Sequence, residues 1–346
     1  MAERMNSISS TQQIHEVRDA SDVAEARRAA DRLAGGDALS DVESGSMALV
    51  ATELATNLIK HAKRGQMIMR LLQQGDSVGC EIIALDSGPG IANVAQSMRD
   101  GYSTAGSSGT GLGAIKRIAT EFDLYSVHGK GTAVMARLWP GGRPPTPRAA
   151  MEFGAIYLPM SGQEVSGDGW AVESLRDKVN WVLVDGLGHG PDAAIAAHAA
   201  LATAVEYREK APAEIVERAH GVLRSTRGAA MAVAEIDAGQ KLVRFCGIGN
   251  ISASIVNSVG IRHLVSHNGI VGQEARKIAE FTYAWSTDSV LIMHSDGLSA
   301  RWDILSYPAL LQRHPALIAG VLYRDFSRGR DDATVLAARE GDHDVR

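Results

Sequence analysis

The chain reads Val-Leu-Val-Asp-Gly-Leu-Gly-His-Gly at residues 182–190, an apolar run that ends in an Asp-Gly pair and a glycine-rich turn. Three further stretches place Asp beside or near Gly: Ser-Gly-Asp-Gly-Trp at 166–170, His-Ser-Asp-Gly-Leu at 294–298 and Gly-Arg-Asp-Asp-Ala-Thr at 329–334. A lone Asp-Gly is usually a turn. This set, mostly at the edges of apolar runs, instead predicts carboxylates held at strand ends around hard cations, because oxygen ligands suit Mg²⁺ and Mn²⁺.

These stretches resemble the metal-dependent serine/threonine phosphatases of the SpoIIE-type branch of the PP2C superfamily, over residues 151–340. The resemblance implies an αββα sandwich and two divalent ions. A water activated by the cations would attack phosphorus in line, without a covalent phosphoenzyme. His189 is a candidate general acid or a residue that shapes the loop, since a near-neutral pKa alone does not make a histidine catalytic. The implied metal ligands are Asp168, Asp185, the Gly186 carbonyl, Asp296, Asp331 and Asp332, with Asp331 preferred over Asp332.

The first half carries a separate pattern at residues 47–62, where apolar residues recur at helical spacing. Glu53 and Asn57 are four residues apart and therefore share one helix face. His61 extends this polar stripe by one more turn. Such a stripe is costly if it is buried without partners, and its alternative interpretation is an ordinary solvent-exposed face.

Two downstream segments favour a nucleotide site over a solvent-exposed face. Asp-Ser-Gly-Pro-Gly at 86–90 follows the strand-like run 78–85, and Gly-Ser-Ser-Gly-Thr-Gly-Leu-Gly at 106–113 leads into a helix-like run. The glycine-rich run offers backbone N–H groups and a helix N-terminus, which suit phosphate oxygens. It does not directly follow a strand, as a dinucleotide-binding fingerprint should, and it lacks the lysine of a P-loop.

This ordered set resembles the GHKL ATPase superfamily, and especially the bacterial anti-sigma-factor serine kinases, or switch kinases, over residues 10–139. The resemblance implies ATP as the cofactor. It makes Asn57 a ligand of the Mg²⁺ on the phosphates and Glu53 the base for the acceptor hydroxyl, and it places the adenine amino group on Asp86. The other implied nucleotide-binding positions are Gly88, Gly90 and Thr132 on the adenine side, and Gly109, Gly111 and Gly113 in a short lid.

The composition bounds the class of protein. A length of 346 residues predicts two domains, and the formal net charge of −5 implies no general affinity for nucleic acid. No apolar run approaches the roughly 20 residues of a membrane helix. The polar start, residues 1–13, lacks an apolar signal core. Cys80 and Cys246 lie within apolar runs and predict buried reduced thiols, so we expect a cytoplasmic protein.

We expect an α/β (α+β) chain with a nucleotide-binding domain at 1–139, a linker at 140–150 and a phosphatase-like domain at 151–346. Four prolines within residues 140–148 favour an extended spacer. The first domain should be an α/β sandwich with helices on one face of its sheet. The expected helices are at 20–33, 39–62, 112–121, 191–209 and 212–224; the expected strands are near 66–73, 78–85, 123–128, 131–138, 153–158, 179–184, 230–236, 241–246, 251–256, 281–285, 289–293 and 333–338.

A kinase-like and a phosphatase-like domain on one chain predict opposed activities on one substrate. In the partner-switching families of the stress response, that substrate is a small STAS-domain protein. Our leading hypothesis is a bifunctional regulator that phosphorylates it with ATP and dephosphorylates it with Mg²⁺ or Mn²⁺. A sigma factor or an upstream sensor is a further candidate partner, and kinases of this kind often form homodimers through this domain.

Two alternatives remain at the level of sequence. The first is a nucleotide-dependent binding module that sequesters a sigma factor or adaptor, with only the phosphatase catalytically active. The second is a histidine-kinase fragment, which is disfavoured because His61 falls inside the nucleotide-binding helix rather than ahead of the domain.

Overall fold

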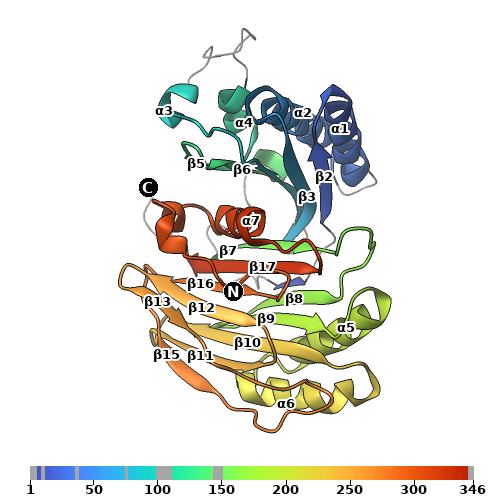
Figure 1. Ribbon diagram of the computed structural model, residues 1–346, viewed down its shortest axis with the longest axis vertical. Coiled ribbons are helices and arrows are strands. Elements are labelled where there is room, and N and C mark those ends of the chain that lie inside the picture. Colours follow the sequence, from blue (N-terminus) through green and yellow to red (C-terminus); the bar gives the residue numbers. More distant parts are fainter. Residues whose placement is uncertain are drawn as a thin grey trace. The chain divides into compact units, whose positions relative to one another are not determined.

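The computed structural model describes residues 6–8, 12–35, 39–74, 77–98, 111–142 and 151–341. Its contacts divide the chain into two compact units (Figure 1). The single-sheet unit comprises residues 10–147 and 307–324, and the sandwich unit comprises residues 1–9, 148–306 and 325–346. Neither unit is one continuous stretch of chain. No helix in the described ranges is both long and apolar enough to cross a bilayer.

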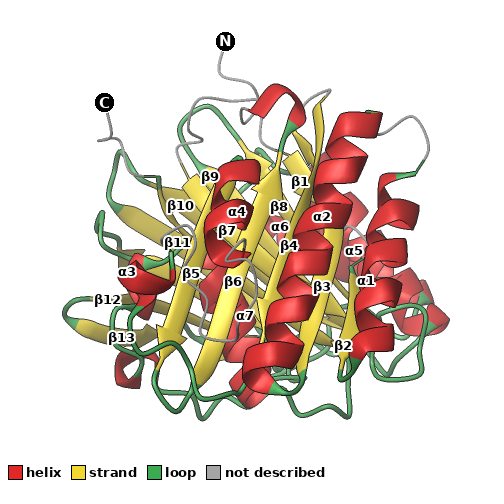
Figure 2. Cartoon of the chain, turned by 90° about the horizontal axis from the view of Figure 1, so that it is seen from above, coloured by secondary structure: helices red, strands yellow, loops and turns green. Residues whose placement is uncertain are grey.

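The single-sheet unit is built on five antiparallel strands in the order β2-β3-β4-β6-β5. Helices α1, α2 and α4 lie along one face of this sheet, as Figure 2 shows from above. Their apolar side chains and one side of the strands form a single buried core. The bounds are β2 Gln13–Val17, α1 Ala20–Ala34, α2 Asp41–Asn57, β3 Gly65–Gln74, β4 Ser77–Leu85, α3 Val94–Ser97, α4 Gly111–Ile118, β5 Glu121–Val127 and β6 Gly131–Leu138.

Local sequence explains where the long helices of this unit begin. Ser40 caps α2: its backbone N donates to Glu43 Oε2 at 2.9 Å, and Glu43 N donates to Ser40 Oγ at 3.4 Å. Asp19 and Asp22 form the same reciprocal capping box at α1. The helix α2 does not end cleanly, because it continues as a π-helical turn, η1 Leu58–Ala62. The predicted helix at 39–62 therefore exists, but it changes its hydrogen-bond period directly after Asn57.

The sandwich unit contains two β-sheets packed over a shared apolar core. A seven-stranded sheet has the order β1-β8-β9-β10-β11-β14, with β15 also on β11, and a five-stranded sheet has the order β13-β12-β16-β17-β7. The bounds are β1 Asn6–Ile8, β7 Met151–Leu158, β8 Asp168–Ser174, β9 Val179–Gly186, β10 Ala229–Asp237, β11 Leu242–Ile248, β12 Ser252–Asn257, β13 Gly260–His263, β14 Ser266–His267, β15 Phe281–Ala284, β16 Val290–His294 and β17 Ala333–Glu340.

Helices α5 Pro191–Glu206 and α6 Pro212–Val222 cover the seven-stranded sheet (Figure 1). Their alanine-rich faces and the strands β8 to β11 form a second buried cluster. Both helices start with proline, which suits the first helical turn because its missing N–H would be unpaired there anyway. Short helical turns complete the set: η2 Pro140–Gly142, η3 Leu223–Ser225, η4 Ile304–Ser306 and η5 Leu310–Gln312.

The expected α/β class is confirmed; two predicted helices exist but end three residues early, and several short elements were not predicted. The helix expected at 112–121 ends at Ile118, and that expected at 191–209 ends at Glu206. The elements not predicted from the sequence are the strands β1, β2, β8, β13 and β14, the short helix α3 and the helix α7 Pro315–Phe326. Both cysteines are buried and unpaired, as predicted.

Candidate functional site

The acidic stretches of the second half meet at strand ends of the two sheets of the sandwich unit. Asp168 begins β8 and lies directly opposite Asp185 of β9 in the strand register. Asp296 follows β16, and Asp331 and Asp332 precede β17, which pairs with β16. The charges of Asp168, Asp296, Asp331 and Asp332 all act on Asp185. The structure thus gathers all five carboxylates into one acidic centre.

The electrostatics of the acidic centre favour a bound cation. Burial, followed by repulsion from its acidic neighbours, raises the pKa of Asp185 above its ordinary value. Burial also raises the pKa of Asp168, against the hydrogen bonds from Ser295 and Thr334. Adjacent carboxylates are costly to ionise together, and a divalent ion relieves that cost. Their oxygen chemistry fits Mg²⁺ or Mn²⁺.

The geometry of the acidic centre suits a hydrated ion rather than a closed protein cage. Within the described ranges, no three His, Cys, Asp or Glu side chains form a ready-made metal-binding group. Mg²⁺ usually keeps several waters and takes only one or two carboxylates, so water ligands would complete such a site. Asp168 Oδ2 is held by Thr334 Oγ1 at 2.7 Å and Asp296 Oδ2 by Asn250 Nδ2 at 2.7 Å.

Asp331 and Asp332 have different surroundings. Both carboxylate oxygens of Asp332 accept backbone N–H groups, Oδ1 from Met160 and Oδ2 from Gly167, each at 2.7 Å. Asp332 therefore fixes the loop between β7 and β8 through two of its backbone N–H groups. Asp331 Oδ1 accepts only a local bond from Asp332 N at 2.9 Å among the interactions recorded for it. This arrangement favours Asp331 over Asp332 as a metal ligand.

Glycine is required at position 186 by close packing. A Cβ there would lie 2.2 Å from Ala193 O and 2.9 Å from Gly167 O. Gly186 N donates to Gly167 O at 3.0 Å, which joins the Asp185-Gly186 turn to the loop before Asp168. The Asp-Gly pair is therefore fixed by backbone contacts from both sides. His189, in the same loop, lies close enough for its charge to act on Asp332.

Thr334→Val is expected to weaken Mn²⁺ or Mg²⁺ binding about 10- to 100-fold, because partners that orient a metal ligand typically contribute this much. Thr334 is fully buried, and its hydroxyl is a donor to Asp168 Oδ2. Calorimetric titration of the metal measures the effect. Thr203→Val is the matched control, since the buried Thr203 hydroxyl donates to Ala199 O within α5. Equal metal affinity in wild type and Thr334→Val would show that the Thr334 hydroxyl does not orient Asp168 for a metal ion.

The residues predicted to contact adenine meet in the single-sheet unit. Asp86 follows β4, and its Oδ1 accepts from Gly88 N at 2.7 Å and Thr132 N at 3.2 Å. Gly90 has φ +72°, and a Cβ there would lie 2.3 Å from Val127 O. Within the described ranges, both donors to the Asp86 carboxylate bond Oδ1, and Oδ2 accepts no hydrogen bond from the protein. The arrangement leaves an acceptor that suits an exocyclic amino group.

The charge state of Asp86 depends on its surroundings. Burial raises the pKa of Asp86, while hydrogen bonds from Gly88 and Thr132 oppose this, followed by the charges of Arg324 and His61. His61 belongs to the π-helical turn and is exposed. The predicted continuous stripe of Glu53, Asn57 and His61 is thus interrupted by η1, since a π-turn shifts side chains relative to an α-helix.

The phosphate side of the nucleotide site is described in part. Asn57 ends α2, and its Nδ2 is buried without a hydrogen-bond partner in the described ranges. A Cβ on Gly111 would lie 3.8 Å from Asn57 Oδ1, so this amide faces the start of α4, where Gly111 and Gly113 lie. An orphaned buried amide beside a helix N-terminus fits a polar, anionic ligand. Gly109 lies outside the described residues.

Three contributors to these sites were not among the predicted site residues. Thr334 ends the acidic stretch 329–334 and Asn250 follows the glycine-containing turn 247–249, so both had a local sequence signal. Arg324 had no such signal: its Nη1 donates to the Asp86 carbonyl at 2.9 Å, across a separation of 238 residues.

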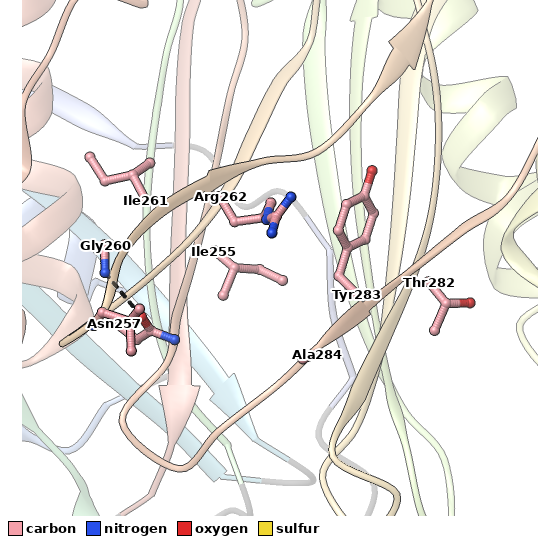
Figure 3. A pocket seen from close by; sticks show the side chains of 9 residues that line it. Ile255, Asn257, Gly260, Ile261, Arg262, Thr282, Tyr283 and Ala284 are labelled. Carbon is pink, nitrogen blue, oxygen red and sulfur yellow. Dashed lines mark hydrogen bonds between the residues drawn. The ribbon is translucent and has the colours of Figure 1, made fainter.

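A pocket of about 560 Å³ lies elsewhere in the sandwich unit, between the β12–β13 hairpin and β15 (Figure 3). Arg262 and Tyr283 contribute the largest side chains shown there. Asn257, which also lines the pocket, ends β12, whereas the opposite end of this strand pairs with His294, two residues before Asp296. None of the predicted site residues belongs to this pocket.

A separate family model matches a stretch in each half of the chain. A family model described as the histidine kinase-like ATPase domain matches residues 17–138. A second family model, described as stage II sporulation protein E (SpoIIE), matches residues 176–340. Both family resemblances seen in the sequence are thereby confirmed.

Individual relatives agree with this division. Over 118 residues the chain is 36% identical to the serine/threonine-protein kinase RsbT of Bacillus subtilis (strain 168), covering 34% of this chain and 89% of RsbT. Over 152 residues it is 26% identical to the phosphoserine phosphatase RsbX of the same strain, covering 43% of this chain and 75% of RsbX. A crystal structure of RsbX in complex with magnesium aligns with a TM-score of 0.51 and 21% identity, covering 57% of this chain and 98% of that one.

Proposed function

Because this chain belongs to the histidine kinase-like ATPase and SpoIIE families through separate stretches of one polypeptide, we propose that it is a bifunctional partner-switching regulator. It phosphorylates and dephosphorylates serine or threonine on one STAS-domain protein in the cytoplasm. We assign the kinase function to residues 1–139 and the phosphatase function to residues 151–346, although the segment 307–324 packs within the single-sheet unit. A linker at 140–150 would join them, and its residues 143–150 lie outside the described residues. The observation that carries the proposal is the presence of an adenine-type cradle around Asp86 and an acidic centre around Asp185 on the same chain.

The phosphatase activity rests on the acidic centre. Asp168, Asp185, the Gly186 carbonyl, Asp296 and Asp331 hold two divalent ions, Mg²⁺ or Mn²⁺, and Asp332 fixes the loop behind them. When bound, such ions activate water and neutralise phosphate charge. Thr334 and Asn250 keep two of the carboxylates in position. RsbX, which the chain resembles, is named a phosphoserine phosphatase, and this supports the same substrate class here.

The kinase activity rests on the nucleotide site. Asp86 accepts a hydrogen bond from the adenine amino group, and Gly88 and Gly90 let the backbone approach the base. The backbone N of Thr132, on β6, donates to Asp86 Oδ1. Asn57 holds Mg²⁺ on the phosphates, close to Gly111 and Gly113, and Gly109 belongs to the same lid. Glu53, one helical turn before Asn57, accepts the proton of the attacking hydroxyl. Phosphoryl transfer depends mainly on positioning and charge neutralisation, which these groups provide.

The proposal is tested with γ-labelled ATP, Mg²⁺, Mn²⁺ and a STAS-domain protein encoded beside this gene. Label should appear on that protein and then turn over. If the protein instead binds the regulator in a nucleotide-dependent way without ever being labelled, the kinase assignment fails. The first domain is then a binding module for an adaptor or a sigma factor.

Glu53→Ala is expected to slow label transfer about 10²- to 10⁴-fold, the usual contribution of a positioned general base, without weakening ATP binding. Initial rates of transfer and the ATP dissociation constant are measured on the same preparation. Glu25→Ala is the matched control, because Glu25 is partly exposed on α1 and pairs only with Arg28 and Arg32 among the described side chains. Transfer at the wild-type rate by Glu53→Ala would remove Glu53 as the base.

A further inference from the structure

One face of the sheet in the single-sheet unit is buried although α1, α2 and α4 all lie on the other face. Side chains alternate along a strand, so Met67, Met69 and Ile82 face the helices while Ile68 and Ile83 face away. Ile68 and Ile83 are nevertheless only 2% and 1% exposed. Another element must therefore cover the second face.

That element is the segment 307–324, which the contacts assign to this unit although it lies inside the SpoIIE match. A Cβ on Gly320 of α7 would lie 3.1 Å from Leu85 Cδ2 and 3.5 Å from Ile83 Cγ2. Every residue of α7 from 315 to 322 is buried. A helix that is apolar on all sides is stable only when it is enclosed.

Polar contacts fix both ends of this segment. At its start, the Asp123 carboxylate of β5 accepts His314 N at 2.7 Å and Arg313 Nη1 at 3.4 Å. His314 Nδ1 in turn accepts Ala316 N at 3.0 Å, which caps the first turn of α7. At its end, Arg324 Nη1 donates to the Asp86 carbonyl at 2.9 Å. The segment thus spans from β5 to the adenine side of the nucleotide site.

We propose that Arg324 is a positioning residue of the nucleotide site, which holds the backbone of Asp86 so that its carboxylate meets the adenine amino group. This inference rests on the proposed role of Asp86 in ATP binding. Asp86 Oδ1 accepts from Gly88 and Thr132, and Asp86 N donates to Thr132 O at 2.9 Å. Arg324 bonds the carbonyl, the other backbone group of Asp86, and leaves Oδ2 for the ligand. An arginine is permanently charged and planar, which suits a directional bond to a carbonyl.

The charge of Arg324 gives the inference a second support. Burial raises the pKa of Asp86, and the charges that oppose this come from Arg324 on α7 and His61 on η1. An ionised carboxylate accepts hydrogen bonds, whereas a protonated one loses part of that capacity. Nucleotide affinity should therefore fall as the pH drops through the pKa of Asp86. Loss of Arg324 should move this fall to higher pH.

The test measures ATP and ADP dissociation constants of the full chain with a fluorescent nucleotide analogue and competition. Arg324→Met is expected to weaken binding about 10- to 100-fold, the range for a hydrogen bond from a charged donor. KM for ATP should rise, while kcat at saturating ATP stays near wild type. Arg324→Lys should restore part of the affinity. Arg313→Met is the matched control, since Arg313 contacts Asp123 at the other end of the segment, and its nucleotide affinity should match wild type.

The outcomes separate this inference from the proposed function. If wild type binds no ATP, the proposed kinase half is wrong. If wild type binds, Asp86→Asn does not, and Arg324→Met binds as well as wild type, only the role of Arg324 is wrong. Equal weakening of nucleotide binding by Arg313→Met and Arg324→Met would show that Arg324 only holds the segment 307–324 in place, and would overturn the inference. If Arg324→Met unfolds at a lower temperature than wild type, Arg324→Lys decides between the two explanations. A higher ATP affinity than that of Arg324→Met, with the pH profile of wild type, supports the positioning role. An ATP affinity no higher than that of Arg324→Met overturns it.

Discussion

Asp185→Asn is expected to lower metal-dependent hydrolysis of a phosphoserine STAS-domain protein by at least about 10³-fold, because the metal contribution amounts to several kcal/mol and about 1.4 kcal/mol corresponds to tenfold. Asp185 lies opposite Asp168 on neighbouring strands, and the charges of Asp168 and three further carboxylates act on it. The amide keeps the shape of the side chain but removes one negative charge from the acidic centre. Release of phosphate from a pre-phosphorylated substrate measures the loss, and titration with Mn²⁺ should show weaker metal binding.

The control for this experiment is Asp288→Asn. Asp288 is an exposed carboxylate of the same unit that bonds only to Ser258 and Ser286 among the described side chains. Its replacement should leave hydrolysis unchanged. Wild-type turnover by Asp185→Asn, with the fold intact by circular dichroism, would remove the acidic centre from the mechanism.

Asp86→Asn is expected to weaken ATP binding by about 100-fold or more, since an unpaired buried polar group and a lost charged hydrogen bond together exceed about 2.7 kcal/mol. Asp86 Oδ1 is committed to the N–H groups of Gly88 and Thr132. An asparagine that keeps this acceptor must present its NH₂ group where the adenine amino group arrives. Two donors then face each other. Equilibrium binding of ATP, with and without Mg²⁺, measures the effect.

Asp31→Asn serves as the control for the nucleotide site, because Asp31 is exposed on α1. Its ATP affinity should equal that of wild type. Retained ATP affinity in Asp86→Asn would show that adenine is not read by this carboxylate. In that case the kinase assignment would fail along with the inference about Arg324.

The parts of both sites that depend on short stretches of chain could be predicted from the sequence. Asp-Gly pairs at strand ends, and the spacing of Glu53 and Asn57, are local patterns whose geometry follows from the periods of strand and helix. The structure brings Asp168 and Asp185 opposite each other, and Asp86 beside Gly88 and Thr132. These contacts agree with the expected groupings.

What the sequence could not reveal depends on contacts between distant stretches. The π-helical turn after Asn57 changes the helical period before His61, whose charge acts on Asp86, and no α-helical pattern indicates this change. The split roles of Asp331 and Asp332 follow from backbone donors at Met160 and Gly167, more than 160 positions earlier.

By itself the sequence determined the two family resemblances, the fold class and the candidate residues, because each depends on local order along the chain. Only the tertiary structure decided the place of α7. Its apolar run at 315–322 has no polar face, so it gives no helical periodicity to read, and its burial depends on strands more than 200 residues earlier. The same long-range packing brings Arg324 to the Asp86 carbonyl, because side chains far apart in sequence meet only once the sheet and the helix are packed together.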